Sequence, residues 1–215
     1  MSDPILNEQI EYYRARAQEY DESIAGVSDL LESGRNLLLK LGKFDSILEL
    51  ACGTGIWTET LLQMGNEVTA VDAAPEMLNI ARKKLGVERI KYQQADLFHW
   101  EPAQQYDLVF FANWLSHVPP TALDDFLGKV KRSVRTGGQI AIIDQYQPSN
   151  SDKQIAKDDI YATRPIEDGR QFTIVKAFYD LDVLQNRFEA LGFEVDINKF
   201  ADTFFFLSGK ASRQT

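Results

Sequence analysis

The chain has little of what several classes of protein require. Its 215 residues include one cysteine and two histidines. A lone cysteine, Cys52, excludes an internal disulfide, and a reducing cytoplasm is the simplest expectation. Only His99 and His117 could assist Cys52 as a nucleophile. We therefore interpret Cys52 as a small buried residue behind a glycine turn, and we expect no metal site.

Long apolar runs and basic stripes are missing too. No stretch approaches the ~20 apolar residues that a membrane span needs. The N-terminus has no basic segment followed by an apolar core, so we expect no signal peptide. The net charge is −9 and no Lys/Arg-rich stripe stands out. This balance disfavours nucleic acid as a substrate.

What is present fits one globular domain, residues 1–215. The hydrophobic content is 44%, and no Pro/Gly/Ser-rich linker divides the chain. Periodicity predicts helices and strands in alternation, which indicates the α/β class. The expected helices are 4–17, 28–41, 56–64, 75–85, 121–134 and 180–191, and the expected strands are 47–50, 68–71, 90–97, 106–113, 136–144, 193–198 and 203–208.

The most informative segment runs from Ile47 to Asp72. An apolar strand ends in the small-residue loop 51–55, an amphipathic helix follows, and a second apolar strand stops on Asp72. Glycines let a nucleoside ligand approach the backbone, and an acid at the second strand end can accept both ribose hydroxyls.

Two nucleotide-type cofactors use such a loop. A dinucleotide site needs G-x-G-x-x-G, but Thr58 stands at the third glycine position. Glu49 opens the loop, where a carboxylate would repel a pyrophosphate and attract an ammonium group. An NAD(P)-dependent oxidoreductase is therefore the weaker alternative.

The pattern E-x-A-x-G-x-G of residues 49–55 resembles the first motif of the class I S-adenosylmethionine-dependent methyltransferases, with Ala51 where glycine is more usual. Residues 73–78, 90–97, 106–113 and 136–144 resemble the next segments of that family in order and spacing, and the likeness continues more loosely to the C-terminus. The resemblance implies a Rossmann-like seven-stranded, mostly parallel sheet with helices on both faces and the last strand antiparallel. Its parts would be an N-terminal helical cap (1–42), a cofactor-binding core (43–145), a substrate-side insertion (146–179) and a closing helix with strands (180–215).

The same resemblance implies S-adenosylmethionine (SAM) as cofactor, S-adenosylhomocysteine (SAH) as product, and in-line methyl transfer to a small organic acceptor. It assigns the methionine amine to Glu49, the ribose to Asp72 and the adenine amine to Asp96. The other cofactor-binding residues that it implies are Ala51, Gly53, Thr54, Gly55, Ala73, Met77, Leu97 and Asn113. A regulatory protein on this fold without an acceptor pocket is a further alternative.

The residues themselves support a ligand site, because the three acids follow successive strands. In an open parallel sheet the carboxyl ends of strands meet at the ligand-binding edge. The simpler interpretation is that Asp72 caps a helix and Asp96 caps a short turn.

The segment 12–21 places aromatic and basic residues side by side near the N-terminus. It resembles the Tyr-rich segment that many small-molecule methyltransferases fold over the cofactor. Tyr13 and Tyr20 are then candidates for cation–π contact with the sulfonium, and Arg16 for the methionine carboxylate. The alternative is that the tyrosines only pack this helix onto the core.

For the acceptor, His117 follows the fourth strand and is a candidate base, with a structural role as the alternative. Long connections usually carry binding function, and residues 147–178 form one. An edge strand with a solvated face is the ordinary interpretation of that segment. The predicted substrate-binding residues are Trp114, Tyr146, Arg170, Lys176 and Tyr179. Oxygen, nitrogen, carbon and sulfur all remain open as acceptor atoms, and so do monomer and homodimer.

Overall fold

The computed structural model describes residues 3–146 and 160–212, and its centre is a seven-stranded sheet. The strand order is β3-β2-β1-β4-β5-β9-β8. Six strands run parallel, and only β9 runs antiparallel to its neighbours. The predicted Rossmann-like fold is confirmed. The strands are β1 Phe44–Leu50, β2 Gly65–Asp72, β3 Ile90–Gln94, β4 Tyr106–Ala112, β5 Val134–Gln145, β8 Phe193–Phe200 and β9 Phe204–Ala211.

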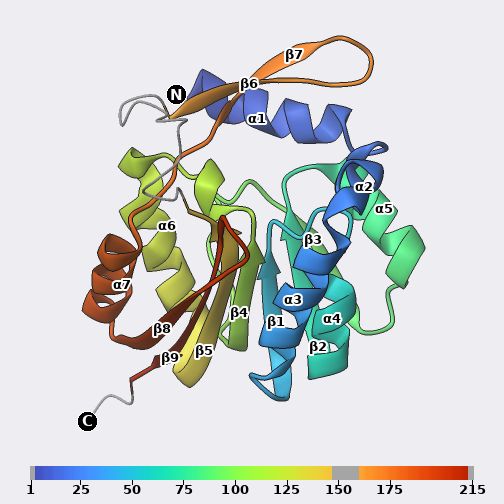
Figure 1. The fold of residues 1–215 in the computed structure, drawn as a ribbon. Helices are drawn as coiled ribbons and strands as arrows, with labels where there is room; N and C mark the ends of the chain where they lie inside the picture. The colour runs from blue at the N-terminus through green and yellow to red at the C-terminus, as the bar shows by residue number, and fades with distance from the viewer. Residues whose placement is uncertain (1–2, 147–159, 213–215) are drawn as a thin grey trace.

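Helices cover both faces of this sheet (Figure 1). One face carries α3 (Ser28–Leu39), α4 (Thr58–Met64) and α5 (Pro75–Leu85), whose apolar residues pack on β1 and β2. The other face carries α6 (Pro120–Ser133) and α7 (Leu181–Ala190). Because both faces are covered, the central strands read as continuous apolar runs.

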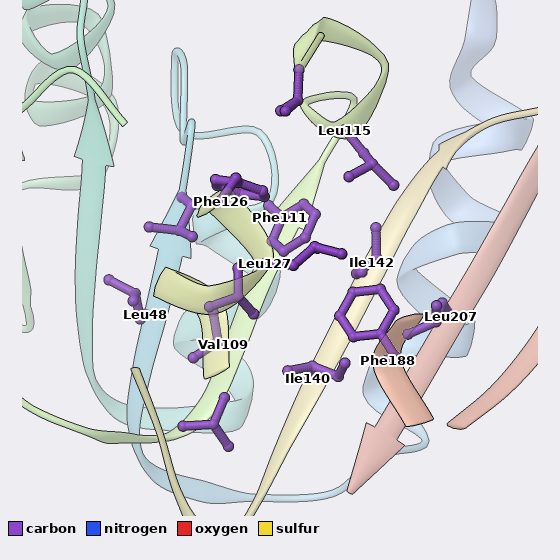
Figure 2. Packing of buried hydrophobic residues seen from close by; sticks show 14 of the residues in the cluster. Leu48, Val109, Phe111, Leu115, Phe126, Leu127, Ile140, Ile142, Phe188 and Leu207 are labelled. Carbon is purple, nitrogen blue, oxygen red and sulfur yellow. The ribbon is translucent and has the colours of Figure 1, made fainter. Parts of the chain in front are cut away.

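Strand β4 shows how this pattern divides the core. Phe111 and Val109 point to the α6 and α7 side, where they join Phe126 and Phe188 (Figure 2). The intervening residue, Phe110, packs on the α3 and α4 side. All three side chains are fully buried. A strand of this kind is rigid, so the residues just beyond its end are held in place.

A smaller layer lies across one end of the sheet (Figure 1). It consists of α1 (Pro4–Ala15), α2 (Tyr20–Ser23), the short turn η1 (Ala25–Val27) and a separate hairpin of β6 (Tyr161–Pro165) and β7 (Gln171–Val175). Asp3 caps α1 by accepting from the Ile5 amide at 3.0 Å. The alternative cap, Ser2, lies outside the described residues.

Several predicted boundaries shift in the structure. The first helix of the core begins at Thr58, two residues later than predicted, because the turn from the glycine loop continues to Trp57. Within the predicted insertion, strand β7 ends at Val175, and residues 147–159 lie outside the described residues. In the described ranges no helix is long and apolar enough to cross a bilayer. The same ranges hold no group of three or more His, Cys, Asp or Glu that could bind a metal.

Candidate functional site

A cavity opens where the parallel strands end, beneath α1. Its volume is about 650 Å³ when the open space at its mouth is included. The registers Leu50↔Val71, Leu50↔Phe111 and Asp72↔Gln94 bring four strand ends to one level. The lining residues are Gln9, Ile10, Tyr13, Tyr20, Ala51, Gly53, Asp72, Ala73, Ala74, Met77, Asp96, Leu97, Ala112, Asn113, Trp114 and His117.

The loop after β1 turns sharply at the cavity wall. Ala51 has φ +53° and Gly53 has φ +55°. The left-handed region is unfavourable for a residue with a Cβ, which explains why glycine is usual where Ala51 stands. Asn113, after β4, has φ +52°, a conformation that asparagine tolerates better. All three residues line the cavity.

Asp72 holds this loop against the start of α5. Its Oδ2 accepts from the Gly53 amide and its Oδ1 from the Ala74 amide, each at 2.8 Å. Burial raises the pKa of Asp72 to about 6, although these hydrogen bonds lower it. The side chain therefore orders the turn before α5 and also lines the cavity. Each carboxylate oxygen keeps a lone pair for a ligand hydroxyl.

Asp96 likewise combines a turn with the cavity wall. It accepts from the Phe98 amide at 2.9 Å and from His99 Nδ1 at 2.7 Å. Leu97 follows it in the chain, and Leu97, Ala73 and Met77 line the same cavity. The four residues predicted to contact adenine therefore all line this one cavity.

Three predicted cofactor residues of the first motif do not line this cavity. Glu49 is buried and accepts from the Thr58 hydroxyl at 2.5 Å. Burial raises the pKa of Glu49 to about 8. Thr54 is also buried, and its hydroxyl donates to Asp21 at 2.5 Å. Gly55 packs on α5, where an added Cβ would lie 2.8 Å from Leu85. These residues support the loop from behind.

A second cavity, of about 1090 Å³ when the open space at its mouth is included, adjoins the first. The two share Tyr13, Tyr20, Ala51, Gly53, Ala112 and Asn113, so these residues form the wall between them. Arg16 lines the second cavity, with its guanidinium 5.1 Å from the ring centres of both Tyr12 and Tyr20. It donates to Ser23 Oγ at 2.7 Å. Cys52 is a buried free thiol that lines only the second cavity, and burial raises its pKa well above the ordinary value.

His117 belongs to the turn η2 (Leu115–His117), and its ring is held at both nitrogens. Nδ1 lies 2.8 Å from the Val175 carbonyl, which can only accept, so Nδ1 carries the proton. Nε2 therefore accepts from the Tyr13 hydroxyl at 2.9 Å. Burial and the charge of Lys176 lower the pKa of His117 to about 3. The imidazole is neutral, and any proton from a ligand would have to pass through Tyr13.

The five predicted substrate-binding residues lie in different parts of the structure. Trp114 lines the first cavity and packs on Phe98 and Phe126. Lys176 lines neither cavity but contacts the turn η2, where its Nζ donates to Ser116 Oγ at 3.1 Å. Tyr179 donates its hydroxyl to the Val118 carbonyl at 2.5 Å and so anchors the end of the same turn.

The other two predicted substrate residues lie elsewhere. Arg170 sits in the β6–β7 turn, with its side chain 58% exposed and paired with Asp168 at 2.7 Å. Asp168 belongs to the same turn, and the placement of Arg170 beside the acceptor stays a prediction. Tyr146 lines neither cavity described above, and Lys199 Nζ lies 4.8 Å from its ring centre.

The sequence analysis did not identify Gln9, whose side chain connects α1 to the turn η2 and to strand β7. Its Nε2 donates to the His117 carbonyl at 3.2 Å, and its Oε1 accepts from the Val175 amide at 3.0 Å. The side chain is 2% exposed. A polar residue at a buried helix position, with apolar neighbours one turn away, was the only available signal. Asp144 and Ser116 complete this support, since the Ser116 amide donates to Asp144 Oδ2 at 3.2 Å.

The fold and the site together define an α/β protein that binds a nucleoside-type cofactor at its strand ends. Asp72 and Asp96 offer acceptors for ribose hydroxyls and an exocyclic amine, and the aromatic faces of Tyr13 and Tyr20 suit a positively charged group. The residues present therefore fit an adenosine cofactor that carries a sulfonium.

Comparison with known proteins leads to the same class. A family profile described as a methyltransferase domain matches residues 47–138. The chain is 34% identical over 118 residues to an uncharacterized methyltransferase of Synechocystis sp., covering 54% of this chain and 53% of that protein. It is 37% identical over 101 residues to a ubiquinone biosynthesis O-methyltransferase of Aeromonas salmonicida, covering 45% of this chain and 41% of that protein. The chain thus spans about half the length of the curated relatives it matches.

Two solved structures of the protein DhpI match nearly the whole chain. A DhpI–SAH complex is 32% identical with a TM-score of 0.86 and covers 100% of both chains. A DhpI–SAM–HEP complex is 33% identical with a TM-score of 0.88 and covers 97% of this chain and 99% of that one. The chain belongs to the class I S-adenosylmethionine-dependent methyltransferases. This result does not favour the NAD(P)-dependent alternative.

Proposed function

We propose that this protein transfers the methyl group of SAM to a small organic acceptor. The observation that carries the proposal is the pair of adjoining cavities at the strand ends, divided by Tyr13, Tyr20 and Asn113. A cofactor with an adenosine part and an amino-acid part, joined at one reactive sulfur, suits two compartments with a shared wall. Residues 1–215 would work as one unit, because the wall combines α1, α2 and the core.

The adenosine part would occupy the first cavity. Asp72 would accept the ribose hydroxyls, while Asp96 and Leu97 would meet the adenine with Ala73 and Met77 against its faces. The amide of Gly53 already donates to Asp72, so the loop and the ribose would share one carboxylate.

The amino-acid part would extend into the second cavity. Arg16 is the cation that lines it, which suits a carboxylate. The rings of Tyr13 and Tyr20 border both cavities and would lie near the sulfonium between them. Glu49 would act from behind the loop through Thr58, and its carboxyl would ionise more readily when the cofactor's ammonium group is near.

The bound cofactor supplies an electrophilic methyl group. The protein's own contribution is alignment and exclusion of water, which suffice for much of the acceleration of an in-line displacement. Tyr13, held by His117, would orient the acceptor at the cavity wall. The layer of α1 and the β6–β7 hairpin would cover the reacting atoms.

Two measurements test this proposal. Isothermal titration of the purified chain with SAM, SAH and NAD(P) should give binding of the first two and none of the third. A screen of phenols, amines, carboxylates and quinones, read as SAH release, should then identify acceptors. Binding of NAD(P) without SAM would contradict the proposal, and SAM binding with no acceptor in any class would favour the regulatory alternative.

A further inference from the structure

Lys129 is a buried lysine of α6 that lines neither cavity. It is 3% exposed, although a lysine is rarely buried unless its charge is paired. Its Nζ donates to the Leu97 carbonyl at 3.4 Å and to the Phe98 carbonyl at 2.6 Å. The same nitrogen lies 2.9 Å from Asp125 Oδ2. The three donors of the ammonium group are thus matched by three acceptors.

The two carbonyls that accept from Lys129 belong to the turn that follows β3 and carries Asp96. A trans peptide group holds its C=O and its N–H on opposite sides. The Phe98 amide, which shares a peptide group with the Leu97 carbonyl, donates to Asp96 Oδ1 at 2.9 Å. The His99 amide, which shares a peptide group with the Phe98 carbonyl, donates to the Asp96 carbonyl at 2.9 Å. Two peptide groups therefore link the ammonium group of Lys129 to Asp96.

The charges at the two ends of these peptide groups have favourable signs. A peptide dipole has its negative end at the oxygen, which here faces Lys129, and its positive end at the N–H, which faces Asp96. Hydrogen bonds in a chain polarise one another, so the ammonium group strengthens the bonds that Asp96 accepts. The other carboxylate oxygen, Oδ2, accepts from His99 Nδ1 at 2.7 Å. The Asp96 carboxylate is therefore held by α6 as well as by its own turn.

The turn also places a donor next to this carboxylate. Leu97 lines the first cavity with Asp96, and the Leu97 amide has no acceptor among the described residues. The Asp96 carbonyl, in the same peptide group, accepts from the amides of His99 and Trp100, so the Leu97 amide points away from them. A carboxylate with a neighbouring N–H is complementary to a base that offers an amine next to an acceptor nitrogen, as adenine does. A shift of the turn would disturb both groups.

We propose that Lys129 is a positioning residue for cofactor recognition, which holds the turn through the Leu97 and Phe98 carbonyls so that Asp96 can accept from the adenine amine. This inference rests on the proposed function, in which Asp96 meets the adenine, and it needs no contact between Lys129 and the cofactor. A lysine that only fastened α6 to the turn would affect the binding of any nucleoside alike. A positioning residue affects most the base that carries the amine.

The test compares SAH with S-inosylhomocysteine, in which an oxygen replaces the adenine amine and the neighbouring ring nitrogen carries a hydrogen. In calorimetry the wild type should bind SAH about tenfold more tightly or better. Lys129→Met should lower SAH affinity by about fivefold or more, and S-inosylhomocysteine affinity by less than about twofold. Asp125→Asn is the matched control, because it removes the ion pair and keeps both carbonyl contacts. It should change both affinities by less than about twofold.

A double variant shows whether Lys129 acts through Asp96. In Asp96→Asn, the further change Lys129→Met should alter SAH affinity by less than about twofold, because the carboxylate that it positions is gone. A full additional loss in the double variant would overturn the inference. Equal losses of the two ligands in Lys129→Met, an unchanged SAH affinity, or a wild type without preference for SAH would do the same. A wild type that fails to bind SAH would overturn the proposed function instead.

Urea unfolding establishes first that each variant is folded under the titration conditions. Lys129→Gln is a second, neutral variant that keeps an amide donor for the two carbonyls. It should reduce the preference for SAH over S-inosylhomocysteine by about threefold or more. If Lys129→Met does not fold, this variant decides, and an unchanged preference in Lys129→Gln overturns the inference.

Discussion

The Thr58 hydroxyl donates to the buried carboxyl of Glu49 at 2.5 Å. These are the two residues that separate this loop from a dinucleotide fingerprint, and the fold makes them partners. Thr58 stands at the first turn of α4, where a glycine would leave the carboxyl without a donor. The sequence difference therefore has a structural cause, since a buried acid at the end of β1 needs this hydroxyl.

The first prediction concerns the pH dependence of stability at Glu49. Burial raises its pKa from 4.5 to about 8 in the folded protein, so between these values the folded state binds more protons than the unfolded state. The contribution of the Glu49 carboxyl to the free energy of unfolding is fully present below about pH 4.5 and is lost as the pH rises through about 8. Between pH 5 and pH 9, the free energy of unfolding of Glu49→Gln should rise by up to a few kcal/mol relative to that of the cofactor-free wild type. Urea unfolding at both pH values measures this change. A difference between the two proteins that does not depend on pH would contradict the assignment.

The second prediction separates two glycines of the same loop. Gly55 has φ +85° and an added Cβ would clash with Leu85, whereas Gly53 has φ +55° and open space around it. Gly55→Ala should lower the free energy of unfolding by about 2–4 kcal/mol, and Gly53→Ala by about 1–2 kcal/mol. SAH affinity should fall mainly in Gly53→Ala, because only Gly53 lines the cavities. Thermal unfolding and titration with SAH measure the two effects. A larger loss of stability in Gly53→Ala together with a larger loss of SAH affinity in Gly55→Ala would contradict these separate roles.

The third prediction tests Asp72 as the ribose partner. Asp72→Ala should weaken SAH binding by about 1–3 kcal/mol through loss of hydrogen bonds to a buried ligand. Because Asp72 also holds the Gly53 and Ala74 amides, Asp72→Asn serves as the variant that keeps one acceptor and most of the turn. Calorimetry should give the highest SAH affinity for the wild type, a lower one for Asp72→Asn and the lowest for Asp72→Ala. Unchanged affinity in both variants would remove Asp72 from the site.

The fourth prediction concerns the Tyr13 hydroxyl. Tyr13→Phe leaves Nε2 of the buried His117 without its donor, which should cost about 1–3 kcal/mol of stability. Tyr92→Phe is the matched control, because the Tyr92 hydroxyl is buried without a hydrogen-bond partner among the described residues. Its stability should change by less than about 0.5 kcal/mol. Methyl transfer should slow at least tenfold in Tyr13→Phe only, and equal rates in the two variants would contradict the role of Tyr13.

Much of this architecture could be predicted from the sequence, because it is encoded locally. Apolar runs that end on Asp72 and near Asp96, with glycines between strand and helix, specify a parallel sheet and its ligand-binding edge. The positions of Tyr13 and Tyr20 in the wall also followed from sequence, through resemblance to a family whose N-terminal segment covers the cofactor.

The remaining features depend on contacts between distant segments. Gln9 reaches Val175, 166 positions away, and nothing in either segment indicates the other. Arg170 is basic and lies near Lys176 in the chain, but its side chain pairs with Asp168 in the β6–β7 turn. The resemblance assigns the methionine amine to Glu49, but it does not indicate that the Thr58 hydroxyl gives this buried carboxyl a partner.

The central claim is that the adenosine and methionine parts of the cofactor occupy the two adjoining cavities at the ends of the strands. A crystal structure of the chain with SAH tests this most directly. We expect the ribose hydroxyls within hydrogen-bonding distance of Asp72, the adenine beside Asp96 and Leu97, and the sulfur between Tyr13 and Tyr20. SAH bound at another surface, or absent from crystals grown at saturating concentration, would contradict the account.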